Sequence, residues 1–426
     1  MHITYHPGMT TYPQNKRSVV VIGAGVAGLA AAWALHQKGF AIRVLDARTN
    51  VAQGASFANG AQLSYSHVQP LADPSVWRQL PSLLFSKSSP FAWRFSWSPA
   101  QWQWLALFAL ACRKSVSAQT TQQLLALGQE SRQAIESMLE QTGIDCLHTQ
   151  AGKLVLYPTP KALSAAQQQM AFQVQMGCEQ HVLSAAEAVQ VEPALLHYQS
   201  RIAGAVFTPS ESVADCHLLC QHLKQWLEGQ GVVFEMGQTA QRLLVSGGQV
   251  TGVQKSTGDV RADHYVLAAG AESPALLATA FPLTRSAVPV YPLKGYSVTL
   301  DVKNCQHDAP SVSVTDASRK LVFARLGSRL RVAGFAEICG HDTTVNPKRI
   351  EQMLLAVREI FPNVETEGHV QPWMGHRPAT PTSRPIVGRL RGGPHNLWMH
   401  TGHGMLGFTL GFGTAKALAS QLHEQE

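Results

Sequence analysis

The chain has 426 residues, of which 45% are hydrophobic and 14% are charged, a composition typical of a globular protein large enough for two domains. Its formal net charge of +7 favours anionic partners, but neither a basic run nor a nucleic-acid-binding motif accompanies it, so no nucleic acid partner is expected. Seven scattered cysteines without a CxxC pair favour buried, reduced thiols over disulfides or a metal site.

The first 16 residues are polar and lack the charged and apolar regions of a secretory signal peptide, so we expect a flexible extension at 1–16. No apolar stretch reaches the ~20 residues that a membrane-spanning helix needs. The expected location is the cytoplasm, with contact to the inner face of the membrane left open.

The first predicted element is a strand at 19–22 that leads into Gly-Ala-Gly-Val-Ala-Gly at 23–28. A helix and a second strand are predicted to follow, and that strand ends at Asp46. This order predicts a dinucleotide-binding unit whose helix N-terminus binds the pyrophosphate. The glycines allow the tight turn, the approach of the pyrophosphate and the close packing of the helix; they are, in that order, Gly23, Gly25 and Gly28.

Asp46 bears on the choice of dinucleotide. Its carboxylate is placed to accept a hydrogen bond from a ribose hydroxyl, and it would repel the 2′-phosphate of NADP. NAD and FAD both remain compatible with this unit, so the rest of the chain must distinguish them.

Helices and strands are predicted along the remaining chain from hydrophobic periodicity and turn residues. We expect a loop that opens a short helix at 56–64, mainly helix at 75–145, a strand at 152–157, and helices at 161–177 and 185–190. Farther on we expect a helix from Asp215 to about 230, strands at 232–234, 242–245, 250–255 and 265–271, an antiparallel sheet over 286–340, and a helix at 347–360. A strand at 397–400 and a helix at 405–422 close the chain.

The expected fold class is α/β, or α+β overall, with a Rossmann-like dinucleotide-binding domain and an inserted antiparallel-sheet domain for the substrate. The predicted dinucleotide-binding domain is discontinuous and comprises 17–84, 200–285 and 368–426. The inserted domain comprises 85–199 and 286–367.

Two later turns are also rich in small residues. The strand at 265–271 ends in Ala269 and Gly270, which suits a close approach of the backbone to a ligand. The closing turn at 401–407 contains a second GxGxxG, but no further strand and acid follow it. In a flavoprotein, the N–H groups of this helix start would suit the pyrimidine end of the isoalloxazine.

Six segments resemble, in family order, the FAD-dependent D-amino acid dehydrogenases of the D-amino acid oxidase and glycine oxidase superfamily. They span nearly the whole chain from about residue 17 and lie at 23–28, 56–62, 289–297, 331–338, 373–388 and 401–404. The resemblance implies noncovalent FAD and the oxidation of a D-amino acid to an imino acid, which hydrolyses to a 2-oxo acid and ammonia. It further implies hydride transfer to flavin N5 and electron transfer to a membrane quinone.

The resemblance also implies roles for particular residues. It places Arg377 on the substrate side of the flavin, where a guanidinium can pair bidentately with a carboxylate. Tyr296 and His376 are the other residues expected to contact or orient the substrate or flavin, and Lys294 lies near the same pocket. The expected FAD contacts are Gly23, Gly25, Val26, Gly28, Asp46, Ala47, Ser56, Asn59, Gly60, Gln62, Ala269, Gly270, Gly402, His403, Gly404, Leu406 and Gly407.

Other functions remain compatible with the sequence. They are a glycine or sarcosine oxidase that uses oxygen, a dehydrogenase of D-proline or D-hydroxyproline type, and a non-catalytic FAD-binding protein. Arg377 and the closing glycine turn argue against the last of these. An NAD-dependent enzyme is disfavoured because no nicotinamide-binding unit follows the first motif.

Residues 91–110 are unusually aromatic. Trp93, Trp97, Trp102 and Trp104 cluster there, with Arg94 between them. Tryptophan beside basic residues is typical of a lipid headgroup boundary, which would suit a peripheral membrane protein. A buried core helix or a subunit contact predicts the same pattern, so both interpretations are kept.

Overall fold

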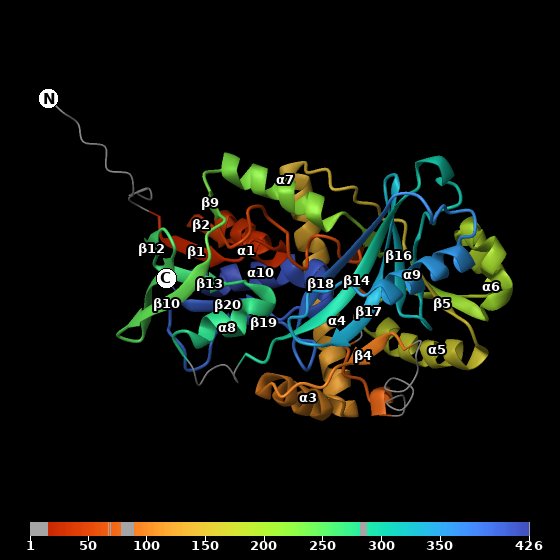
Figure 1. Cartoon of the computed structure of the whole chain (residues 1–426), viewed down its shortest axis with the longest axis horizontal. Coiled ribbons are helices and arrows are strands. Elements are labelled where there is room, and N and C mark those ends of the chain that lie inside the picture. Colours follow the sequence, from red (N-terminus) through yellow and green to blue (C-terminus); the bar gives the residue numbers. More distant parts are fainter. Residues whose placement is uncertain (1–15, 67, 69, 78–88, 282–287, 426) are drawn as a thin grey trace.

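The structure, a computed structural model, describes residues 16–425 except 67, 69, 78–88 and 282–287. Two large sheets lie next to each other, one built mainly from the two ends of the chain and one mainly from its middle (Figure 1). This arrangement confirms the expected α/β fold class with a parallel dinucleotide-binding sheet and an antiparallel sheet. The extension expected at 1–16 lies outside the described residues except for residue 16.

The six-stranded sheet has the strand order β19-β20-β13-β1-β2-β9, and only β19 runs antiparallel to its neighbour. Its strands are β1 (Ser18–Ile22), β2 (Ala41–Asp46), β9 (Val233–Met236), β13 (His264–Leu267), β19 (Ile386–Arg389) and β20 (Leu397–Thr401). Strand β1 is buried on both faces because Val19 and Val21 pack into one core cluster while Val20 and Ile22 pack into another.

Helices cover one face of this sheet, and a small antiparallel sheet covers the other (Figure 1). The helices are α1 (Val26–Gln37), α4 (Lys114–Thr142), α7 (Cys216–Gly229) and α10 (Gly407–His423). The opposite face carries β10 (Ala240–Ser246), β11 (Gln249–Lys255), β12 (Gly258–Val260) and α8 (Ser273–Ala278). Because apolar side chains cover both faces, the ligand-binding edge of the sheet is its open end, where the strands finish.

The nine-stranded sheet has the order β18-β14-β17-β16-β15-β5-β7-β6, with β4 added beside β17. Its strands are β4 (Phe91–Trp93), β5 (Lys153–Tyr157), β6 (His181–Leu183), β7 (Gly204–Thr208), β14 (Tyr291–Asp301), β15 (Ser313–Asp316), β16 (Leu321–Leu326), β17 (Arg329–Ile338) and β18 (Val370–Ala379). One face of this sheet packs against α6 (Ala185–Val191), η1 (Pro193–Arg201) and α9 (Pro347–Ile360).

The structure corrects two local expectations. The segment at 56–64 contains no helix; instead β3 (Gln62–Leu63) pairs with β8 (Ser212–Val213). Residues 91–93 form a strand rather than a helix, because their backbone extends the edge of β17 at 336–338. The helices expected at 75–145 are α3 (Pro99–Ala111) and α4, and 78–88 lie outside the described residues.

Sheet membership also differs from the expected domain limits. Strands β7 and β18 fall in the segments 200–285 and 368–426, which the sequence assigns to the dinucleotide-binding domain, yet both belong to the nine-stranded sheet. We therefore propose that these two limits lie after Thr208 and after Ala379. The limits at 84 and 285 fall on residues that the structure does not describe.

Candidate active site

The predicted dinucleotide-binding residues meet at the carboxyl edge of the parallel strands. The turn after β1 is tied to β2 by the Gly23 N–H, which donates to the Leu45 carbonyl at 2.7 Å. Beyond β13, the Gly270 carbonyl accepts from the Thr401 hydroxyl at the end of β20, at 3.0 Å. Turns that are far apart in the sequence are thus held together at one edge, where α/β sheets bind their ligands.

The geometry at the start of α1 fits a pyrophosphate. Gly23 has φ +111°, and a Cβ there would lie 2.5 Å from the Ala268 carbonyl oxygen, so no side chain is tolerated. A Cβ on Gly28 would overlap the Gly23 carbonyl, so the absence of a side chain at Gly28 allows helix and strand to pack closely. Gly25 is the N-cap and offers no side-chain cap to the helix. These features leave the helix N-terminus open to an anion.

Two side chains fix the surroundings of this turn. Asp46 accepts hydrogen bonds from the Ala24 and Arg48 N–H groups at 2.7 and 2.8 Å, which holds its carboxylate at the sheet edge beside the exposed Ala47. The Ser56 hydroxyl accepts from the Val26 N–H at 3.0 Å. Both residues therefore lie at the turn that the sequence predicts to bind the dinucleotide.

The segment at 56–62 connects this edge to the nine-stranded sheet. The Ala58 carbonyl accepts from the Ser297 hydroxyl at 2.7 Å, and the Asn59 carbonyl accepts from Arg331 at 3.0 Å. A Cβ on Gly60 would lie 3.2 Å from Val322. Gln62 donates to the Ser313 hydroxyl in the same sheet. Ser56, Asn59, Gly60 and Gln62 thus line the boundary between the two sheets.

The closing turn touches the end of β18. Ala379 and His403 form an isolated antiparallel bridge, and a Cβ on Gly402 (φ +78°) would lie 2.6 Å from Thr380. A short 3₁₀ turn, η5 (Gly404–Leu406), leads into α10 at Gly407.

Two buried histidines lie at the closing turn: His400 at the end of β20 and His403 within the turn. Both contact the same hydroxyl group. The Nε2 atoms of both rings lie 2.9 Å from the Thr414 hydroxyl, and His400 Nδ1 lies 3.0 Å from the Ala27 carbonyl. Since a carbonyl only accepts, His400 carries its proton on Nδ1. Burial lowers the pKa of His400 to about 4 and holds the pKa of His403 well below its usual range, so both rings are neutral.

A small cavity, of about 20 Å³, lies between the closing turn and the nine-stranded sheet. It is lined by Leu71, Leu293, Ala379, Thr380, Ser383, His403, Gly404, Met405 and Leu406.

Arg377 lies on the same face of the nine-stranded sheet as two residues of this cavity. It pairs with Leu293 across the β14–β18 ladder, and Ala379 is two residues farther along the strand. Its side chain crosses β14 over Gly295, where any Cβ would clash with the guanidinium. Beyond Gly295, Nη1 donates to the Phe335 carbonyl at 2.7 Å and Nη2 to the Gly334 carbonyl at 3.3 Å.

The Arg377 side chain is half-buried, and its guanidinium has no carboxylate partner among the described residues. Desolvation lowers its pKa to about 10, so the group remains a cation at neutral pH. A partly buried cation is costly unless it is paired, and two carbonyl contacts neutralise none of its charge. This site is therefore suited to bind an anion.

Tyr296 and His376 are not brought to Arg377. Side chains alternate along a strand, so both residues point to the opposite face of the sheet, with Lys294. His376 Nε2 lies 3.0 Å from the Asp342 carbonyl, and burial lowers its pKa. Lys294 also contacts this segment, through the Asp342 carboxylate at 3.3 Å. The Tyr296 hydroxyl, which was expected near the substrate, contacts Glu337 instead.

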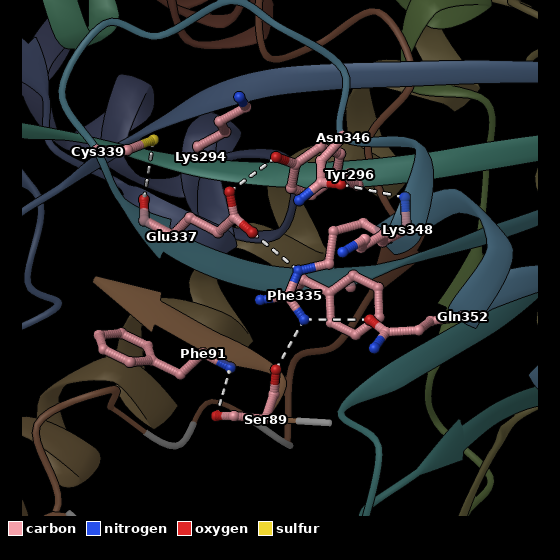
Figure 2. A network of polar contacts seen from close by, with 12 residues as sticks. Ser89, Phe91, Lys294, Tyr296, Phe335, Glu337, Cys339, Asn346, Lys348 and Gln352 are labelled. Atoms are coloured by element: carbon pink, nitrogen blue, oxygen red, sulfur yellow. Dashed lines mark hydrogen bonds and ion pairs between the residues drawn. The ribbon is translucent and has the colours of Figure 1, made fainter. Parts of the chain in front are cut away.

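Tyr296 belongs to a buried network that includes Glu337, Arg349 and Phe335 (Figure 2). The Tyr296 hydroxyl donates to Glu337 at 2.7 Å, and Arg349 Nε of α9 donates to the same carboxylate at 2.8 Å. The Arg349 guanidinium carbon lies 4.7 Å from the centre of the Phe335 ring. The network therefore holds the side chain of Phe335, the residue whose carbonyl accepts a hydrogen bond from Arg377.

Phe335 is the residue that sequence reasoning missed. It has φ +59°, a left-handed conformation that is uncommon for a bulky residue, and it lies at a bulge in the β14–β17 ladder. No sequence pattern predicts this conformation. Gly295 could have been found, because a glycine inside a strand often marks a close approach of another group.

An open parallel sheet with a glycine-rich edge, joined to a large antiparallel sheet, is the architecture of an FAD-dependent oxidoreductase. A sequence model of the DAO family, described as FAD dependent oxidoreductase, matches residues 18–421. D-amino acid dehydrogenase 2 of Pseudomonas aeruginosa is 40% identical over 406 residues, which cover 95% of this chain and 94% of the relative.

Solved structures agree on the fold. Glycine oxidase from Bacillus cereus has a TM-score of 0.73 at 20% identity and covers 96% of each chain. L-proline dehydrogenase from P. horikoshii has the same TM-score at 16% identity and covers 96% of this chain and 94% of that one. The chain belongs to the DAO family of FAD-dependent oxidoreductases; it uses FAD rather than NAD, and it oxidises amino acids.

The network behind Phe335 yields a stability prediction. Replacing Arg349 with Met leaves the Glu337 carboxylate buried without its cation, which should lower the free energy of unfolding by about 3–5 kcal/mol. Urea unfolding would measure this loss. The matched control is Arg358→Met on the same helix, whose pair with Glu351 is more exposed and should contribute at most about 1 kcal/mol. Equal losses in the two variants would contradict the importance of burial.

The histidine pair predicts that acid destabilises the fold. The pKa of His400 is lower in the folded protein than in the unfolded chain, so below pH 6.5 the unfolded chain binds the additional proton. His400 alone should therefore lower the free energy of unfolding by about 2 kcal/mol between pH 7 and pH 5. His400→Gln should flatten this pH profile, whereas the exposed His181→Gln should not. Parallel profiles for wild type and His400→Gln would refute the prediction.

Proposed function

We propose that the protein oxidises D-amino acids to imino acids, which hydrolyse to 2-oxo acids and ammonia. The observation that carries this proposal is the half-buried Arg377 cation, which lacks a carboxylate partner among the described residues. It lies on the same face of the nine-stranded sheet as Leu293 and Ala379, which line the cavity at the closing turn. An α-amino acid supplies the missing carboxylate, and a bidentate pair would fix its α-carbon for hydride transfer. The 40% identity to a D-amino acid dehydrogenase supports the D configuration.

We further propose that FAD is held noncovalently by the glycine-rich turn after β1, by Asp46, by the segment 56–62 and by the closing turn. When bound, FAD supplies the two-electron oxidant, which accepts the α-hydride at N5. The protein's own part is to bind the carboxylate and to orient the α-carbon toward that oxidant. Hydride transfer from a neutral amine needs no strong side-chain base, which agrees with the neutral His403 in the cavity wall.

The electron acceptor in this proposal is a quinone. Its support is the name of the relative, a dehydrogenase, together with an exposed aromatic surface. The side chains of Trp93, Phe95, Trp97 and Trp102 contact one another, and Trp97 is 86% exposed. Trp104 of the same segment is buried, so the segment is partly core and partly surface.

We propose that this aromatic surface contacts the membrane headgroups on the cytoplasmic side. Arg94, which is largely exposed, and the exposed Arg113 and Lys114 can attract anionic lipid. No helix among the described residues is both long and apolar enough to cross a bilayer. Contact at the surface, rather than insertion, is the mode that this arrangement supports.

Two related activities are the alternatives. They are oxidation of glycine or sarcosine by oxygen, and oxidation of an imino acid such as D-proline or D-hydroxyproline. A glycine oxidase and an L-proline dehydrogenase share this fold, so the fold alone does not choose between these activities. Anaerobic reduction of the bound flavin by a panel of D- and L-amino acids, glycine and sarcosine distinguishes these activities.

The role of Arg377 is tested by Arg377→Met. The variant should bind FAD but lose on the order of 3 kcal/mol of transition-state stabilisation, a reduction of kcat/KM by about 100-fold or more. Gly295→Ala keeps the charge but displaces the guanidinium, so it should raise KM for the amino acid. The control is Arg384→Met, an exposed arginine in the loop after β18. Near-normal efficiency of Arg377→Met would show that another group binds the carboxylate.

The acceptor is tested by comparing flavin reoxidation in air and with a soluble quinone, with and without anionic liposomes. A dehydrogenase should react slowly with oxygen and rapidly with quinone, and the protein should sediment with the liposomes. Rapid peroxide formation without liposome binding would support an oxidase instead.

A further inference from the structure

A second cavity, of about 120 Å³, lies near the first one. Trp104 and Tyr291 line the second cavity, and both pack in one apolar cluster with Leu293 and Ala379, which line the first. The Trp104 indole N–H donates to the Ala379 carbonyl at 2.8 Å, so its ring is fixed in this wall. The two cavities therefore border the same apolar cluster.

The lining of the second cavity is neutral and largely apolar. It comes from 96–104 before and within α3, from 271–275, from 288–292 and from 340–341. His341 of this lining forms an ion pair with Glu272 when it is protonated, and the Tyr291 hydroxyl accepts from the Gly340 N–H at 2.9 Å. The lining holds no arginine or lysine, so it does not suit an amino acid carboxylate.

The second cavity lies between the turn proposed to contact FAD and the protein surface. Ala271, in its wall, directly follows Gly270, which belongs to the turn proposed to contact FAD. Ser96 and Ser98, in the opposite wall, alternate along the chain with the exposed Phe95 and Trp97. A ligand in this cavity would thus lie between the dinucleotide edge and the aromatic surface.

We propose that the second cavity binds the ring of a lipid-soluble quinone, the electron acceptor. A neutral ring with two carbonyl oxygens matches apolar walls that carry serine and glutamine groups, and an apolar tail would leave past the aromatic surface. The proposal rests on the proposed function, because a dehydrogenase has two substrates of different chemistry. Overall, the amino acid loses its α-hydride and one ammonium proton to become the iminium, and the quinone gains both electrons and both protons to become the hydroquinone.

The test fills the cavity and measures binding directly. Ala100→Phe adds a ring inside the cavity, and Ala106→Phe adds the same ring on an exposed position of the same helix. Isothermal titration of the oxidised, FAD-loaded protein with decylubiquinone should show at least tenfold weaker binding for Ala100→Phe and unchanged binding for Ala106→Phe. Ala275→Phe, at an exposed position of the cavity rim, is a second filling variant if Ala100→Phe fails to fold.

Two rates distinguish this proposal from the proposed function. For the filled variants, anaerobic flavin reduction by a D-amino acid and reoxidation by ferricyanide should match wild type, while reoxidation by decylubiquinone should fall at least tenfold. Unchanged quinone binding in both filled variants, or equal weakening in Ala106→Phe, would overturn the cavity assignment. Failure of every D-amino acid to reduce the wild-type flavin would instead overturn the proposed function and leave the binding measurement interpretable.

Discussion

The placement of one guanidinium organises the candidate site. Arg377 starts on β18, crosses β14 where Gly295 has no side chain, and ends on two carbonyls of β17. Three adjacent strands therefore have to keep their register for this group to remain in place. This half-buried cation has lost part of its hydration, and no described carboxylate compensates for the loss, so the site favours the binding of an anion.

The other face of the same sheet supports this arrangement. At the bulge in β17, the Phe335 backbone turns its carbonyl toward Arg377 while its ring contacts Arg349 on α9. Strained backbone conformations persist where the surroundings determine them fully, and here the ring is held by a cation that is itself held by Glu337. The ion pair behind the sheet and the carbonyls in front of it are parts of one structure.

The sequence allowed the dinucleotide edge to be predicted because short-range patterns encode it. Gly23, Gly28 and Asp46 have local roles that follow from strand, turn and helix geometry. The sides of the nine-stranded sheet were harder to assign, since Tyr296 and Arg377 lie on different strands and their relation depends on register. Phe335 could not be predicted at all, because a left-handed residue at a bulge follows from long-range packing rather than from its own preferences.

The cavity at the closing turn has walls of two kinds. Leu293 and Ala379 belong to strands of the nine-stranded sheet, whereas Leu71, Ser383 and Met405 come from loops and a short turn. Loops accept substitutions and changes of length that strands in the middle of a sheet do not. Under the proposed function, relatives of this chain could diverge in the size and polarity of the amino acid they select while the proposed carboxylate anchor, Arg377, stays constant, since the loops and the strand that carries Arg377 are structurally independent parts.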